Sequence, residues 1–359
     1  MCALCSMKYK NFLAILLVIC ICFTYFAERS LHFDILVSGQ KHIATRNRET
    51  FKYKNVSTIS PNLKKMSPNS TQGVTIKMPY LLENPWLCSS VANLTVLIIV
   101  HTATSHYKHR LAIRETWANN SYYPKLGSVR VLFLLGKVKN ASLQDDIEKE
   151  FKQHADILQG DFIDSYHNIT YKGVMAYKWL NEKCRNAKTV LKVDDDVIVN
   201  MFHFLSKYVS LLQHKTRYIF CRRFHNTKIM RNGASKWHVE NSVFKNQKFY
   251  PDYCQGFVVV ISNDIVPALY DSALQQPFFW VDDIYLYGLV PKNISGIQYI
   301  NMKYGKDVIW GADKARKCYG SGTCPYLAVL LWSDIPVAMD EIWQLMVHNY
   351  NKTFIHGQK

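Results

Sequence analysis

The chain has 359 residues, of which 48% are hydrophobic and 20% charged, a globular balance that excludes a wholly disordered chain and supplies enough apolar residues for a sizeable core. Its formal net charge of +17 favours partners that carry phosphate or lie at a membrane surface, although the basic residues could equally solvate the surface. The sequence has no zinc-finger spacing, RNA-recognition signature or dense basic run, so we expect no nucleic-acid partner.

The first predicted element is a helix over residues 11–27, an uncharged apolar run that follows a basic segment. A helix of this length covers roughly 25 Å, enough for a thin bilayer. Bulky Tyr25 and Phe26 replace the small residues that a cleaved signal peptide would need, so we expect an uncleaved signal anchor. The positive-inside rule then makes residues 1–10 a cytosolic tail and places the rest of the chain in the lumen.

The sequons and cysteines agree with this orientation. Asn-x-Ser/Thr sequons begin at Asn55, Asn69, Asn93, Asn119, Asn140, Asn168, Asn293 and Asn351. All lie after the apolar run, which favours passage through the secretory pathway. The cysteines on the lumenal side are Cys88, Cys184, Cys221, Cys254, Cys318 and Cys324. Their even number predicts disulfides of unknown pairing, with Cys318 and Cys324 a plausible local loop.

The rest of the chain divides into a polar stem over residues 28–86 and a folded domain over residues 87–359. Within the folded part, strands and helices alternate. Strands are predicted at 94–101, 129–135, 156–158, 189–193, 218–221, 256–261 and 326–332, and helices at 108–118, 142–154, 170–186, 201–212, 264–273 and 282–289. This order predicts an α/β fold with a mainly parallel sheet and helices on both faces.

Acidic residues follow the predicted strand 189–193 directly, as Asp194, Asp195 and Asp196. Ligands of open α/β sheets bind at the carboxyl ends of strands. Neighbouring carboxylates repel one another unless a cation is present, and oxygen ligands suit Mg²⁺ or Mn²⁺. The pattern therefore predicts a metal site, although a solvated acidic turn would give the same sequence.

A second acidic pair, Asp282 and Asp283, lies within an apolar and aromatic stretch that includes Trp280. Burial raises the pKa of a carboxylate and makes it a better base near neutral pH. Either aspartate could instead cap the helix that follows. Both interpretations remain open at this level.

Two further segments carry candidate binding groups. Arg110 and Arg114 are four residues apart on one predicted helix face and could bind a phosphate, or could form structural ion pairs. Residues 161–172, which include Asp164 and Lys172, lie between a strand and a helix on the ligand edge of the sheet, where a capped loop is the alternative.

Taken in order, these segments resemble the β-1,3-galactosyltransferase family, glycosyltransferase family 31. The resemblance rests on six motifs: Arg-x-x-x-Arg-x-Thr-Trp at 110–117, Val-x-Phe-Leu-Leu-Gly at 131–136, Asp-Phe-x-Asp-Ser-Tyr-x-Asn-Ile-Thr-x-Lys at 161–172, Lys-x-Asp-Asp-Asp-Val at 192–197, Tyr-Pro-Asp-Tyr-Cys-Gln-Gly at 250–256 and Asp-Asp-Ile-Tyr at 282–285. Each motif alone is weak, but six in order over residues 94–343 are specific.

The resemblance implies a GT-A fold, a UDP-sugar donor, a Mn²⁺ or Mg²⁺ cofactor and a glycan acceptor on a glycolipid or glycoprotein. It implies an inverting transfer to the acceptor's 3-hydroxyl by a single-pass type II protein of the Golgi membrane. Asp194 and Asp196 would hold the metal and the donor, and Asp283, with Asp282 second, would be the general base. Arg110, Arg114, Asp164, Lys172, Asp194 and Asp195 would shape the nucleotide-sugar pocket.

One departure from the family concerns the metal. The resemblance places Ser333 where the family has a metal-binding histidine. This difference motivates an alternative function, in which the chain is a catalytically silent relative that acts as a chaperone or partner subunit. A lectin-like binding module is a third hypothesis, but it leaves the acidic triplet and Asp283 without a role.

Overall fold

The computed structural model describes residues 74–76, 79–212 and 214–356. The predicted cytosolic tail, signal anchor and most of the predicted stem lie outside these residues, as do the sequons at Asn55 and Asn69. Among the residues that the structure describes, no helix combines the length and the apolar character needed to cross a membrane.

The centre of the fold is a mixed sheet of seven strands in the order β3-β2-β1-β4-β7-β6-β8. In that order the strands are Ile157–Ile163, Val129–Lys137, Val96–His101, Thr189–Asp194, Tyr253–Ser262, Tyr218–Phe224 and Gln298–Asn301. Strands β3, β2, β1 and β4 are parallel, β7 is antiparallel to both of its neighbours, and β8 is parallel to β6. The predicted α/β fold with a mainly parallel sheet is thereby confirmed.

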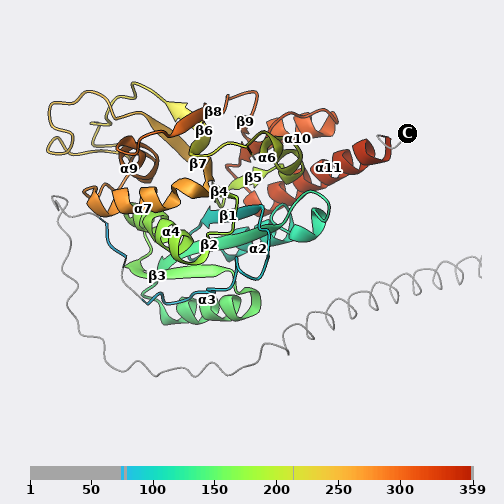
Figure 1. Ribbon diagram of the computed structural model, residues 1–359, viewed down its shortest axis with the longest axis horizontal. Helices are drawn as coiled ribbons and strands as arrows, with labels where there is room; N and C mark the ends of the chain where they lie inside the picture. Colours follow the sequence, from blue (N-terminus) through green and yellow to red (C-terminus); the bar gives the residue numbers. More distant parts are fainter. Residues whose placement is uncertain (1–73, 77–78, 213, 357–359) are drawn as a thin grey trace, which may run out of the picture. The chain divides into compact units, whose positions relative to one another are not determined.

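Helices cover both faces of this sheet because the buried strands present apolar side chains to each side in turn (Figure 1). In β1, Val96, Ile98 and Val100 belong to one core cluster, and Leu97 and Ile99 belong to the other. The first cluster includes side chains of α2 (Tyr107–Glu115), α3 (Ala141–His154) and α11 (Ile335–His356). The second includes α4 (Ile169–Lys183) and α7 (Val266–Gln275), which lie side by side in Figure 1.

A second, three-stranded sheet extends the first core. Its order is β5-β10-β9, with the strands Val197–Val199, Ala328–Leu330 and Val308–Trp310. Helix α10 (Ala312–Gly320) packs beside α11 next to this sheet. The remaining helical segments are short: η1 (Asn120–Tyr122), η2 (Tyr166–Asn168), α5 (Met201–His203), η3 (Phe204–Tyr208), α6 (Val209–Leu212), η4 (Asn263–Ile265), α8 (Asp282–Ile284), η5 (Tyr285–Leu289) and α9 (Val290–Lys292).

Several element boundaries differ from the prediction for local reasons. Helix α3 begins after Asn140, not Ser142, because the Asn140 side chain accepts a hydrogen bond from the Leu143 backbone N–H at 3.2 Å. The folded part begins before residue 87, since Val74, Ile76 and Tyr80 are already buried in the core. The last residues of the predicted stem therefore belong to the folded part.

Disulfides in the described part of the chain join Cys88 to Cys184, Cys221 to Cys254 and Cys318 to Cys324. The predicted local pair of Cys318 and Cys324 is confirmed. The first bridge ties the segment before β1 to the end of α4, and the second ties β6 to β7. The sequence alone could not assign these two pairings, because each joins residues that only the folded sheet brings together.

Candidate active site

A cavity of about 700 Å³ opens at the carboxyl ends of β1 and β4. These two strands are adjacent and parallel, and His101 at the end of β1 pairs with Asp194 at the end of β4. The chain runs outward from β1 to β2 and β3 on one side and to β4 on the other, so this edge is a topological switch point, where ligands of α/β sheets bind. The volume lies within the range typical of small-molecule sites, about 300–1,000 Å³.

The acidic triplet lines this cavity together with the acidic pair of α8. The lining residues include Asp164, Lys172, Asp194, Asp195, Asp196, Trp280, Asp282 and Asp283. The predicted catalytic and metal residues therefore meet in one place, although they come from a loop after β4 and from a helix almost ninety residues later in the chain.

Asp195 is the most firmly held of the triplet. Its carboxylate accepts a hydrogen bond from Thr102 Oγ1 at 2.5 Å, and His106 Nδ1 lies 2.8 Å away. Burial alone would raise the pKa of Asp195, but its contacts with His106, His109 and Thr102 outweigh burial and bring the pKa well below its usual range. Asp195 is therefore a fixed negative charge at the cavity wall.

Asp194 is more exposed, with 39% of its side chain accessible, and Lys192 Nζ donates to its Oδ1 at 2.7 Å. Lys192 is buried and also donates to the Gly256 carbonyl at 2.6 Å. Burial would lower the pKa of Lys192, but the carboxylates of Asp194, Asp282 and Asp283 raise it overall. The buried ammonium group of Lys192 is thus attracted both to Asp194 and to the acidic pair Asp282 and Asp283.

Asp196 has the environment of a cation ligand. Its Oδ1 is buried and has no hydrogen-bond partner among the described residues. Burial, with the negative charges of Asp194 and Asp195, raises the pKa of Asp196 to about 7. A divalent cation beside the triplet would satisfy the unpaired oxygen and offset the repulsion, so these residues fit a hard metal ion such as Mn²⁺ or Mg²⁺.

Asp282 and Asp283 are the first two residues of α8, but neither caps it, because the N-cap residue is Val281 and no side chain makes a capping hydrogen bond. Burial raises the pKa of both carboxyls. The charge of Asp282 raises the pKa of Asp283 further, and the charge of Asp194 raises that of Asp282, whereas the charge of Lys192 lowers both. A backbone hydrogen bond from Gly256 also reaches Asp283. A carboxylate with a raised pKa beside a cavity is suited to accept a proton near neutral pH.

Lys172 and Asp164 form a buried ion pair at 2.9 Å on the cavity wall. Lys172 Nζ also donates to the Thr102 carbonyl, and Asp164 accepts from the Gly136 N–H at 2.7 Å. Burial lowers the pKa of Lys172, although the Asp164 charge opposes the effect. This pair joins the loop after β1, the end of β2 and the segment after β3 at the cavity edge.

Arg110 and Arg114 do not line the cavity, which corrects the prediction of a direct nucleotide contact. Arg110 is 1% exposed and pairs with Glu150 at 2.6 Å, while Arg114 pairs with both Glu150 and Asp156. The structural alternative is therefore correct. Arg110 still supports the site indirectly, because it donates to the Ala103 carbonyl at 2.8 Å in the loop that borders the cavity.

Comparison with known proteins supports the family suggested by the motifs. The family model described as Galactosyltransferase matches residues 108–303. The chain belongs to this family. Human "Beta-1,3-galactosyltransferase 1" is 29% identical over 264 residues, covering 72% of this chain and 76% of the relative. Rat "Lactosylceramide 1,3-N-acetyl-beta-D-glucosaminyltransferase" is 30% identical over 228 residues, covering 60% of each chain.

A solved glycosyltransferase involved in the glycosylation of the major capsid of PBCV-1 is also similar, at 12% identity and a TM-score of 0.38, covering 70% of this chain and 99% of that one. This likeness is too slight to support an argument about the site. The family itself makes the chain a glycosyltransferase, and the catalytically silent alternative is not favoured.

The cavity of about 700 Å³, called the transferase cavity below, is also lined by Lys236 and Trp237, which no sequence motif marked. Trp237 and Lys236 come from the long loop between β6 and β7, and Trp237 Nε1 donates to Tyr166 Oη at 2.9 Å. The His167 ring lies tilted against the Trp280 ring, with the two ring centroids 4.5 Å apart. No periodicity marks the loop residues, because the long connection reaches the cavity only through the tertiary fold.

Ser333 is not among the residues that line the transferase cavity. It lines a separate cavity of about 440 Å³ with Trp310, Trp332 and residues of α10. Nevertheless the segment that follows β10 and leads to Ser333 lies close to the acidic triplet, since the Leu331 N–H donates to the Asp196 carbonyl at 2.8 Å. In the described structure, Ser333 therefore supplies no metal ligand to the transferase cavity.

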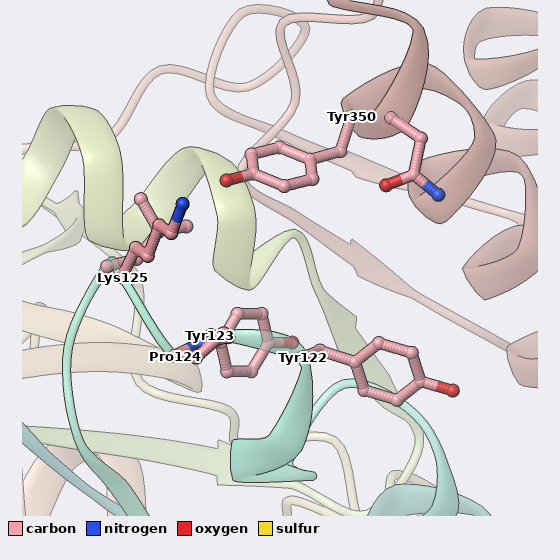
Figure 2. Close-up of a pocket in the computed structure, with 7 residues that line it drawn as sticks. Tyr122, Tyr123, Pro124, Lys125 and Tyr350 are labelled. Atoms are coloured by element: carbon pink, nitrogen blue, oxygen red, sulfur yellow. The ribbon is translucent and has the colours of Figure 1, made fainter. Parts of the chain in front are cut away.

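A smaller cavity of about 240 Å³ lies between the Tyr122–Leu126 turn and the end of α11. Figure 2 shows the ring of Tyr350, from α11, across the cavity from Lys125. None of its lining residues is acidic, and the volume is below the usual range of small-molecule sites, which begins at about 300 Å³. Its lining therefore lacks the acidic side chains that meet in the larger cavity.

Proposed function

We propose that the chain transfers galactose or an N-acetylhexosamine from a UDP-sugar to the 3-hydroxyl of a glycan on a glycolipid or glycoprotein, forming a β-1,3 linkage with inversion. The family match and the names of its relatives support this function. The observation that carries it is that the acidic triplet and Asp283 line a single cavity at the switch point of the sheet.

The fold proposed for this activity is of the GT-A type, with β1 to β4 as the nucleotide-binding half. The nucleotide would bind at the ends of β1 and β4, where Asp194 and Asp195 line the cavity. The Lys172–Asp164 pair would shape the same pocket, because it joins the segments at the ends of β1, β2 and β3 at that edge. Arg110 would act through the loop that it holds.

The metal ligands proposed are Asp194 and Asp196. Asp196 supports this role through its unpaired buried oxygen, and Asp194 through its exposure to the cavity. When bound, the ion supplies positive charge for the diphosphate leaving group. Lys192, which donates a hydrogen bond to Asp194, would hold that carboxylate in its orientation between the donor and the base.

Asp283 is the proposed general base. It would remove the proton from the acceptor's 3-hydroxyl as that oxygen attacks the anomeric carbon of the donor, and UDP would leave from the opposite face. Burial and Asp282 raise the pKa of Asp283, which favours proton uptake near neutral pH. Trp280, which lines the same cavity, would pack against a sugar ring.

We also propose that the enzyme is a single-pass type II protein of the Golgi membrane with a lumenal catalytic domain. The uncharged run at residues 11–27 and the sequons after it support this placement. The disulfides of the folded part support an oxidising compartment.

The purified full-length protein should be offered each UDP-sugar in turn with Mn²⁺ and a panel of β-linked glycan acceptors. We expect transfer from one donor, and loss of at least about a hundredfold on Asp283→Asn, the range reported for general-base catalysis. Asp271→Asn, an aspartate of α7 outside the cavity, is the matched control. Absence of transfer from every donor, with a folded protein, would reject the proposal.

A further inference from the structure

Two histidines beside the acidic triplet have no role in the proposed reaction. His106 is at the N-cap position of α2, without a side-chain capping hydrogen bond, and His109 lies three residues later, so both rings project from the start of that helix. Their ring centroids are 4.5 Å apart. Both rings face the carboxylate of Asp195, His106 through Oδ2 and His109 through Oδ1.

The ligand atoms of these three side chains lie within 4.8 Å of one another. His109 Nδ1 is 3.5 Å from Asp195 Oδ1, and this buried nitrogen has no hydrogen-bond partner among the described residues. Two ligands bound at about 2.1 Å to one tetrahedral ion are about 3.4 Å apart. The spacing of His109 and Asp195 therefore suits a shared ion, and the closer His106 ring would need to move outward by a fraction of an ångström.

The donor set also specifies the kind of ion. Two imidazoles and one carboxylate suit Zn²⁺, Co²⁺ or Ni²⁺, whereas Mg²⁺ and Mn²⁺ prefer oxygen ligands. Thr102 Oγ1 donates to Asp195 Oδ2 and would orient the carboxylate, as outer partners of metal ligands do. Three protein ligands leave a fourth position for water or a substrate atom.

We propose that His106, His109 and Asp195 form a binding site for a divalent transition metal of the zinc class, distinct from the oxygen ligands Asp194 and Asp196. The ion borders the transferase cavity, because His106 and Asp195 both line it. This inference goes beyond the proposed function and does not depend on it. The competing explanation is a purely structural cluster in which Asp195 only anchors the start of α2.

Titration of the purified full-length protein with Co²⁺ tests the proposal, because the visible absorption of tetrahedral Co²⁺ bound to imidazole is far more intense than that of octahedral oxygen-bound Co²⁺. We expect one equivalent to bind with this spectrum, and Zn²⁺ to displace it. His106→Gln and His109→Gln should each weaken binding by at least about tenfold, since losing even an outer partner of a metal site costs 10- to 100-fold. Zn²⁺ should also raise the melting temperature of the wild type but not that of the double variant.

His225→Gln is the matched control. His225 Nδ1 lies 2.7 Å from the Asp252 carboxylate, but no second histidine completes a metal-binding group there among the described residues. This control variant should leave the Co²⁺ spectrum unchanged, and so should Asp196→Ala. The proposal is overturned if the wild type gives no such spectrum, if the two histidine variants keep it, or if Asp196→Ala abolishes it. Sugar transfer with Mn²⁺ is measured separately, so failure of this site and failure of the proposed reaction are distinguishable.

Discussion

Gly256 on β7 offers a direct way to displace the proposed base without unfolding the protein. A Cβ added at Gly256 would lie 1.9 Å from Asp283 Oδ1 and 2.9 Å from its carboxyl carbon. An ordinary contact is about 3.5 Å or longer, so the carboxylate would have to move by roughly 1.5 Å. A misplacement of about 1 Å in an active site can cost about a hundredfold in rate, and we expect a fall in kcat of at least that size for Gly256→Ala.

The fold should tolerate this change, because the Cβ meets side-chain atoms of Asp283 and Lys192 and no backbone atom within its three nearest contacts. Gly233→Ala is the control, since a Cβ there meets nothing within 4 Å. Initial rates of sugar transfer, with donor KM and melting temperature measured alongside, provide the assay. Donor KM should change little.

A double-mutant cycle with Asp283→Asn shows whether the loss acts through the base. If it does, adding Gly256→Ala to Asp283→Asn should lower the residual rate little further, because the two changes disable the same group. A Gly256→Ala enzyme that is folded and keeps its rate within about threefold of wild type would refute the account of Asp283, since about a hundredfold is required.

Three other outcomes follow from the charges of the site and core. Because burial and Asp282 raise the pKa of Asp283, kcat/KM should fall as the pH drops through that raised pKa. Asp282→Asn should shift this fall to lower pH, as measured by the pH dependence of kcat/KM at saturating Mn²⁺. Glu150→Gln should reduce the free energy of unfolding at neutral pH by about 3 kcal/mol in denaturant titrations, because it leaves two buried arginines without their shared carboxylate. Burial would raise the pKa of Glu150, but the arginines lower it overall. The ionised Glu150 therefore stabilises the wild type above its unfolded pKa of about 4.3, and this stabilisation is lost as the pH falls through the lowered pKa of the folded state. The difference in unfolding free energy between wild type and Glu150→Gln should therefore become smaller in acid. Chelation should abolish transfer, and Mn²⁺ should restore it; transfer that persists in the chelator would exclude a metal requirement.

The parts of the fold that could be predicted are those with a local signal. The run at Thr189–Asp194 is apolar and ends in acids, so both the strand and its ligand edge are evident from the sequence. The alternation of such strands with helices indicates the parallel core. The short strands β5, β8 and β9 were missed because three or four residues carry no measurable periodicity.

The residues of the candidate site also divide into those with a local sequence signal and those whose role depends on distant partners. Asp194, Asp196 and Asp283 follow strong local patterns and line the cavity as expected. Arg110 and Arg114 were misassigned because helix spacing shows which face they share but not which acids that face meets. Glu150 and Asp156, their actual partners, lie some forty residues away in sequence.

The histidine cluster and the aromatic cavity mouth could not be predicted for a related reason. His106 and His109 have the spacing of helix neighbours, but their significance depends on Asp195, which β4 brings alongside β1. Trp237 reaches Tyr166 across a long connection between β6 and β7. Contacts of this kind depend on strand order, which a local pattern does not encode.

In the proposed reaction, the acids at the end of β4 bind a nucleotide diphosphate through a divalent cation. Calorimetric titration of the full-length protein with UDP, with and without Mn²⁺, tests it most directly. We expect Mn²⁺ to tighten UDP binding at least about tenfold, a difference of about 1.4 kcal/mol, and the Asp194→Ala/Asp196→Ala double variant to lose that gain. UDP affinity that is the same with and without Mn²⁺, and the same in the double variant, would contradict the account.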